Sequence, residues 1–111
     1  MDYQTLSQMR ARHSAWRLLL ADHAPLVITF LHAAFIVSNE RSLSEASLQS
    51  RLEDTLFQLR DEYGEAAFPR SAAEYLNDWA ANDKGWLRKF YPPDDDEAHF
   101  DLTPATEKVI T

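Results

Sequence analysis

The stretch RKFYPPDDDEAHFDLTP, residues 88–104, decides the fold, because its apolar residues are spaced differently from those before it. Apolar and polar residues alternate on both sides of its centre, a period of two that is typical of half-buried strands. Pro92, Pro93 and the acids that follow them interrupt a strand ladder. The stretch therefore predicts an antiparallel β-hairpin with an acidic loop, and then a helix with Thr103 as its cap and Pro104 as its first residue.

The residues upstream of the hairpin predict three longer helices. The first, from Pro25 to Val37, is apolar nearly all round, so we expect protein to surround it and His32 to be a hydrogen-bonded core residue. The second spans residues 44–64 and the third residues 71–83, and each begins at a serine that is a good N-cap. Gly85 supplies a left-handed end to the third helix.

This order of elements predicts one mainly helical domain with a small antiparallel β-hairpin, a winged helix-turn-helix. A chain of 111 residues fits one domain with one core. We expect N-terminal helices over residues 1–24 and the winged-helix core over residues 25–111. The last predicted helix has barely begun where the sequence stops at Thr111, so we expect a fragment of a longer chain.

The net charge of −7 is unevenly distributed along the sequence. Residues 1–41 hold four arginines against three acids, a net +1, so residues 42–111 carry −8. Free nucleic acid is a poor partner for that second part, because non-specific affinity comes mainly from lysine and arginine. The sequence has no cysteine, no recognisable signal peptide and no apolar run long enough to span a bilayer. We therefore expect a cytoplasmic protein without membrane contact.

The sequence offers no constellation that would carry catalysis or hold a metal. The acidic run lacks the alternate ligand spacing and the glycine of a calcium loop. None of the four histidines has a histidine partner at i+4, and two glycines are too few for a phosphate-binding loop. We therefore expect no enzymatic activity, no cofactor and no metal.

The third helix and the hairpin loop are the elements that a winged helix presents to DNA, and both are acidic here. The helix carries three acids and no base, and the loop has four consecutive acids. Carboxylates repel phosphates, so contact with a protein surface is the functional interpretation. The alternatives are a solvated loop and, for the aromatic residues of the helix, core packing. The candidate protein interface comprises Tyr75, Asp78, Trp79, Asp94, Asp95 and Asp96.

DNA binding, as a regulator or a DNA clamp, is the main alternative function. It would use arginines away from the third helix, and the candidates are Arg10, Arg12, Arg17 and Arg41. A docking module for another subunit, with the acidic loop as its contact, is a second alternative.

Five stretches together carry a family resemblance: SAWRLLLADHAPLVITFLHAAF, LEDTLFQLRD, PRSAAEYLNDWA, KGWLRKFYP and FDLTPATEKVI. In this order and combination they resemble the N-terminal region of JetA, the kleisin-like subunits of the Wadjet (JetABCD) bacterial condensins, which are similar to MukF. The resemblance covers nearly all 111 residues.

The resemblance implies a winged-helix domain that dimerises at the N-terminus of a longer, nucleoid-associated subunit. It further implies that later regions bind the SMC-like ATPase and its KITE partner. The whole complex would extrude loops of DNA and act against plasmids, with another subunit cutting the DNA. We therefore expect a non-catalytic homodimerisation and interaction module in a plasmid-defence complex.

Overall fold

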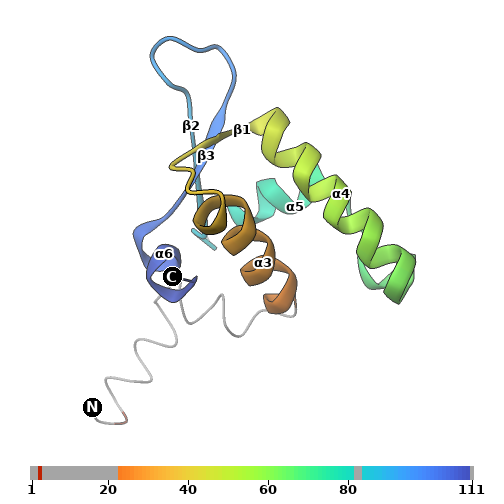
Figure 1. The fold of residues 1–111 in the computed structure, drawn as a ribbon. Helices are drawn as coiled ribbons and strands as arrows, with labels where there is room; N and C mark the ends of the chain where they lie inside the picture. The colour runs from red at the N-terminus through yellow and green to blue at the C-terminus, as the bar shows by residue number, and fades with distance from the viewer. Residues whose placement is uncertain (1–2, 4–22, 82–83, 111) are drawn as a thin grey trace.

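The protein is mainly helical with a small antiparallel sheet, as the sequence predicts, but the sheet has three strands where the sequence predicts a two-stranded hairpin (Figure 1). A computed structural model describes residue 3 and residues 23–81 and 84–110. Of the predicted N-terminal helical region, residues 1–24, only residues 3, 23 and 24 belong to the described residues. The elements are α3 (Ala24–Leu31), the π-helix η1 (His32–Val37), β1 (Leu43–Ser44), α4 (Glu45–Tyr63), the 3-10 turn η2 (Glu65–Ala67), α5 (Ala72–Trp79), β2 (Leu87–Phe90), β3 (His99–Leu102) and α6 (Pro104–Ile110).

The predicted hairpin is present, and its second strand lies at the centre of the sheet. β2 pairs with β3, with Leu87 opposite Leu102, and the strand order is β1-β3-β2. The sequence prediction missed β1, in which Leu43 lies opposite Phe100. A two-residue strand is too short to show a period of two, so only its long-range partner reveals it.

The predicted start and end of α4 are confirmed. Ser44 Oγ accepts a hydrogen bond from the Ser47 N–H at 3.2 Å, and Gly64 ends the helix with a φ of 91°. The leucines at positions 48, 52 and 56 are fully buried. This one-sided stripe fixes α4 against the core, while the opposite side remains in solvent.

Helix α5 begins as predicted but ends four residues early. Ser71 Oγ caps it by accepting from the Glu74 N–H at 3.2 Å. The helix stops at Trp79 instead of residue 83, because the Trp79 carbonyl accepts the N–H of Trp86 at 3.0 Å. This bond turns the chain toward β2. Gly85 has the expected left-handed φ of 64°, and it closes a turn after the helix.

The segment from α3 through η1 is buried on one side only. Its buried positions recur every four residues, at 26–27, 30–31 and 34–35. The prediction that protein surrounds this helix is therefore wrong, and so is the core role of His32, which is exposed. The wider turns of η1 suit a period of four better than an α-helix with 3.6 residues per turn does, so they keep Ala34 and Phe35 directed at the core.

One hydrophobic core joins α3, η1, α4, α5 and the sheet. Phe30 and Trp79 face each other at its centre, with 6.2 Å between their ring centroids. Thr106 of α6 is fully buried, and its hydroxyl lies 3.0 Å from the Thr103 hydroxyl. Within the described ranges, no helix is long and apolar enough to cross a membrane.

Candidate interaction surfaces

Two residues of the predicted interface belong to the core instead. Tyr75 and Trp79 are 3% and 2% exposed, and their rings lie 6.0 Å apart. Both lie on the side of α5 that packs against the other helices, while Glu74 and Asn77 are exposed. The prediction of Tyr75 and Trp79 as interface residues is therefore wrong, and core packing, the alternative interpretation, is confirmed.

Asp78 of α5 is half-buried and lies between two cations. Its Oδ2 is 3.7 Å from Lys84 Nζ and 3.8 Å from Arg70 Nη1. Lys84 also lies over the ring of Trp86, at 5.6 Å from its centroid. The Asp78 carboxylate is thus largely neutralised by its own chain, which leaves little charge for a partner.

The acidic loop between β2 and β3 carries Asp94, Asp96 and Glu97 as exposed carboxylates, and Asp95 organises it. Asp95 Oδ1 accepts the Glu97 N–H at 2.9 Å, and Asp95 Oδ2 lies 2.9 Å from His99 Nε2. The hydrogen bond from the Glu97 N–H, and next the one from His99, hold the pKa of the Asp95 carboxyl below its usual range. The loop therefore presents a defined cluster of negative charge.

The cations at the base of the hairpin are engaged by carboxylates. Arg88 donates to both carboxylate oxygens of Asp101, at 3.0 and 2.6 Å, and these bonds raise the pKa of Arg88. Lys89 Nζ lies 2.9 Å from Glu45 Oε2. Neither side chain is therefore available to contact a phosphate without giving up a protein partner.

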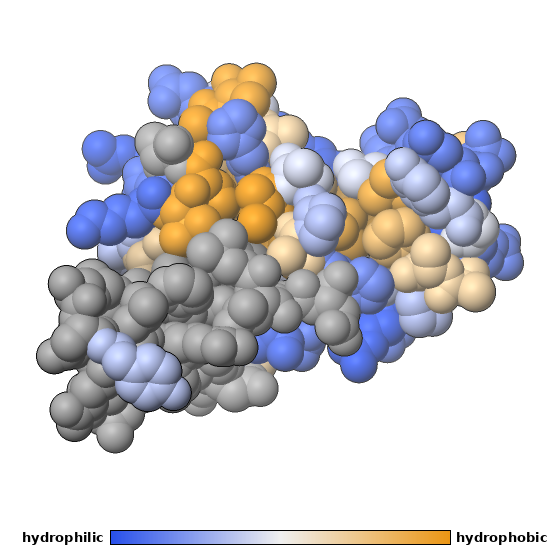
Figure 2. Space-filling view, turned by 90° about the horizontal axis from the view of Figure 1, so that it is seen from below, coloured by the Kyte–Doolittle hydropathy of each residue, from blue (hydrophilic) through white to orange (hydrophobic). Residues whose placement is uncertain are grey.

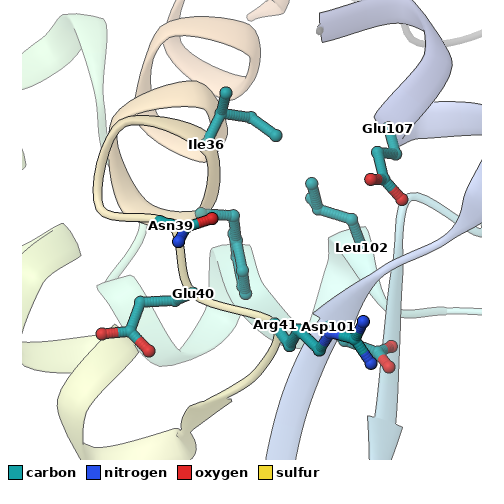
Figure 3. Close-up of a pocket in the computed structure, with 8 residues that line it drawn as sticks. Ile36, Asn39, Glu40, Arg41, Asp101, Leu102 and Glu107 are labelled. Atoms are coloured by element: carbon teal, nitrogen blue, oxygen red, sulfur yellow. The ribbon is translucent and has the colours of Figure 1, made fainter.

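A pocket of about 450 Å³ opens between the end of η1, β3 and α6 (Figure 3). Ile36 and Leu102 lie on opposite walls and form part of its apolar lining. Arg41 lies beside Asp101 at the rim of the pocket. The Glu40 side chain points away from Arg41. Carboxylates on this rim offset the charge of Arg41, which makes the pocket a poor phosphate site.

Arg41 is the only one of the four predicted DNA-contacting arginines that lies within the described residues. Arg10, Arg12 and Arg17 lie outside them.

An apolar groove of about 470 Å³ lies between the start of α3 and the end of α4. It was not found from the sequence, because its walls come from three separate segments. Tyr63, at the end of α4, lies on the groove and is 65% exposed. Figure 2 views this side from below and shows orange hydrophobic surface with blue hydrophilic surface at its margins. The groove is lined by His23, Pro25, Leu26, Thr29, Leu59, Tyr63, Ala67 and Phe68.

Among the described residues, no group of three or more histidine or carboxylate side chains is placed to hold a metal. The described surface has an acidic loop held by hydrogen bonds, an apolar groove, and ion pairs between residues of this same chain.

Comparison with known proteins gives one family and one relative. The family model described as "Protein of unknown function (DUF3375)" matches residues 8–111. A Mycolicibacterium smegmatis protein described as uncharacterized is 44% identical over 109 residues, which are 98% of this chain and 23% of the relative. The chain thus spans less than a quarter of that relative. No solved structure matches.

Proposed function

We propose that this chain, which belongs to the family described as "Protein of unknown function (DUF3375)", is a non-catalytic winged-helix module that pairs with a second copy of itself. In this proposal it is the N-terminal dimerisation module of a kleisin-like subunit in a Wadjet-type complex that acts on plasmid DNA. The module would act by joining two larger units and would catalyse no reaction itself.

The order of the elements supports a winged-helix arrangement. Three helices, α3, α4 and α5, are followed by the β2–β3 hairpin, and β1 joins the sheet through β3. In such an arrangement α5 takes the position of the recognition helix, and the acidic loop takes that of the wing.

The observation that carries the proposal is the acidic loop, which would take the place of a DNA-contacting wing. It presents four exposed carboxylates at residues 94–97, and α5 adds the exposed Glu74 and no lysine or arginine of its own. Phosphate contacts supply most of the affinity for DNA, so carboxylates in these places favour a protein partner.

The family resemblance supports a second copy as that partner. Because the chain spans 23% of its relative, regions that would bind an SMC-like ATPase and a KITE subunit belong, in this proposal, to the rest of a longer protein. The exposed apolar groove supports the same role, since an amphipathic helix of a partner can lay its apolar side into a hydrophobic groove.

Sedimentation equilibrium of residues 1–111 over a range of concentrations tests the proposal. We expect a reversible equilibrium that approaches twice the monomer mass at high concentration. A monomer at every concentration would contradict dimerisation by this chain.

Docking of another subunit on the acidic loop is the second candidate, and the Asp95 hydrogen bonds favour it because they hold the loop in one conformation. Neutralising Asp94 and Asp96 to asparagine should slow association with the SMC-like and KITE subunits and weaken its salt dependence. An unchanged on-rate would exclude the loop as that contact.

A further inference from the structure

We propose that the apolar groove between α3 and α4 takes residues 4–21 of the second copy, so that the two copies exchange their N-terminal segments. This inference rests on the proposed dimerisation and names the segment and the groove that perform it. Residues 4–21, QTLSQMRARHSAWRLLLA, lie outside the described residues, and the groove lies entirely within them.

The groove has the form that one side of a helix can fill. Leu26 and Thr29 of α3 lie on one wall, and Leu59 and Tyr63 of α4 lie on the other. Leu59 is half-buried and Tyr63 is 65% exposed, so apolar surface remains open to an occupant. A helix that lies along the groove covers both walls at once, which is the usual way in which amphipathic helices occupy hydrophobic grooves.

The sequence of residues 4–21 supplies an apolar side of this kind. Trp16, Leu19 and Leu20 recur at i, i+3 and i+4, the spacing that brings side chains to one side of a helix. Leaving such large apolar side chains in water is unfavourable, and the groove offers them apolar surface. The segment and the groove therefore match in hydropathy.

The rim of the groove carries carboxylates that this chain does not neutralise. Glu62 adjoins the groove residue Tyr63 on α4, and Glu65 begins η2. Both are exposed and have no ion pair with any of the residues that the structure describes. Arg60 does not pair with them, because its guanidinium donates to two backbone carbonyls, at 3.0 and 2.6 Å.

Residues 4–21 carry the complementary charge. They hold three arginines and no aspartate, glutamate or lysine, so their net charge is +3 and nothing within the segment offsets it. Arg10 and Arg17 are seven residues apart, about two helical turns, so in a helix both border the same edge of its apolar side. Opposite charges therefore flank an apolar contact, an arrangement that selects the partner and fixes its register.

The short connection to α3 favours exchange between copies over folding back within one chain. Only Ala21 and Asp22 separate Leu20 from His23, and His23 is itself part of the groove. The rings of His23 and Phe68 lie 5.6 Å apart, a contact that holds the start of α3 at the groove. A helix that ended at Leu20 would have to reverse within two residues to enter its own groove, and short strained hinges favour exchange of an element between copies.

Charge reversal on both sides of this contact tests the exchange in the 111-residue chain. The groove variant carries Glu62→Lys and Glu65→Lys, and the segment variant carries Arg10→Glu and Arg17→Glu. Sedimentation equilibrium should show a dimer dissociation constant raised about tenfold or more for each variant alone, because like charges oppose in both of its contacts.

An equal mixture of the two variants should recover most of the wild-type affinity. In the heterodimer, each segment meets a groove of opposite charge, so both contacts are restored. Native mass spectrometry distinguishes this heterodimer from the two homodimers. Recovery in the mixture is specific to exchange, because a segment that fills its own groove stays opposed by like charge whichever chain it is mixed with.

The double variant Asp94→Lys and Asp96→Lys is the matched control for the groove variant. It makes the same change in net charge on the exposed hairpin loop, which lies at the other end of the molecule from the start of α3 (Figure 1). We expect its dissociation constant to equal that of wild type. Thermal melts of every variant check that the fold is intact.

The remaining outcomes separate this inference from the proposed function. Weaker dimers for both variants without recovery in the mixture would overturn the exchange. Dimers that neither variant weakens would overturn the groove as the contact while leaving dimerisation intact. A wild-type chain that stays monomeric would contradict the proposed function itself, and the exchange with it.

Discussion

At the scale of single residues, the structure shows which aromatic side chains are buried and which are exposed, a difference that the sequence alone does not reveal. Phe30 is 5% exposed and packs against Trp79, whereas Phe57 on α4 is 76% exposed. A stripe of Tyr75 and Trp79 at helical spacing fits a core and an interface equally well, because both bury an apolar side of the helix. Only the packing of α5 against α3 decides between them.

Phe30→Ala should lower the free energy of unfolding by about 3–5 kcal/mol, the range for removing a large buried aromatic side chain. That is a large part of the roughly 5–15 kcal/mol available to a domain of this size. Urea denaturation measures it. Phe57→Ala is the matched control, and it should stay within about 0.5 kcal/mol of wild type because the ring is exposed. Equal losses for the two variants would contradict the placement of Phe30 in the core.

At the scale of the elements, the starts of helices were predictable from a few adjacent residues. Ser44 and Ser71 cap their helices through bonds three residues along the chain, and both were predicted. The end of α5, the strand β1 and the π-turns of η1 were not, since each depends on partners distant in the sequence or on packing. No local sequence signal in this chain indicates the wider turns of η1.

Ser71→Ala should destabilise the domain by about 1 kcal/mol, because it removes the oxygen that accepts the Glu74 N–H. Ser50→Ala provides the comparison, since Ser50 lies exposed within α4 and alanine favours helix. Thermal unfolding of both variants should show a lower midpoint for Ser71→Ala alone. A Ser71→Ala midpoint equal to that of wild type would mean that the cap contributes nothing.

At the scale of the whole molecule, charge was predictable and surface shape was not. The excess of acids in residues 42–111 follows from the sequence, and the structure places part of it on the hairpin loop and on the exposed side of α4. The apolar groove combines residues near 25, 60 and 68, so it exists only once α3, α4 and η2 have packed together. No short stretch could have indicated it.

The charge distribution predicts weak binding to DNA. Fluorescence anisotropy with a labelled duplex should show no saturable binding by residues 1–111 at 150 mM salt and micromolar protein. Repeating the titration at lower salt tests the alternative that uses arginines, because affinity carried by phosphate contacts rises steeply as salt falls. Tight binding at 150 mM salt would contradict the proposal that this chain contacts protein and not DNA.

The position of β3 in the sheet also affects how the chain folds as it is synthesised. β3 lies between β1 and β2, yet it comes last of the three strands in the sequence. On a ribosome, Leu43 and Leu87 emerge before Phe100 and Leu102, the residues that lie opposite them. The sheet therefore stays open until nearly all of this region has left the exit tunnel. Until then β1 and β2 lack the strand with which each of them pairs in this sheet.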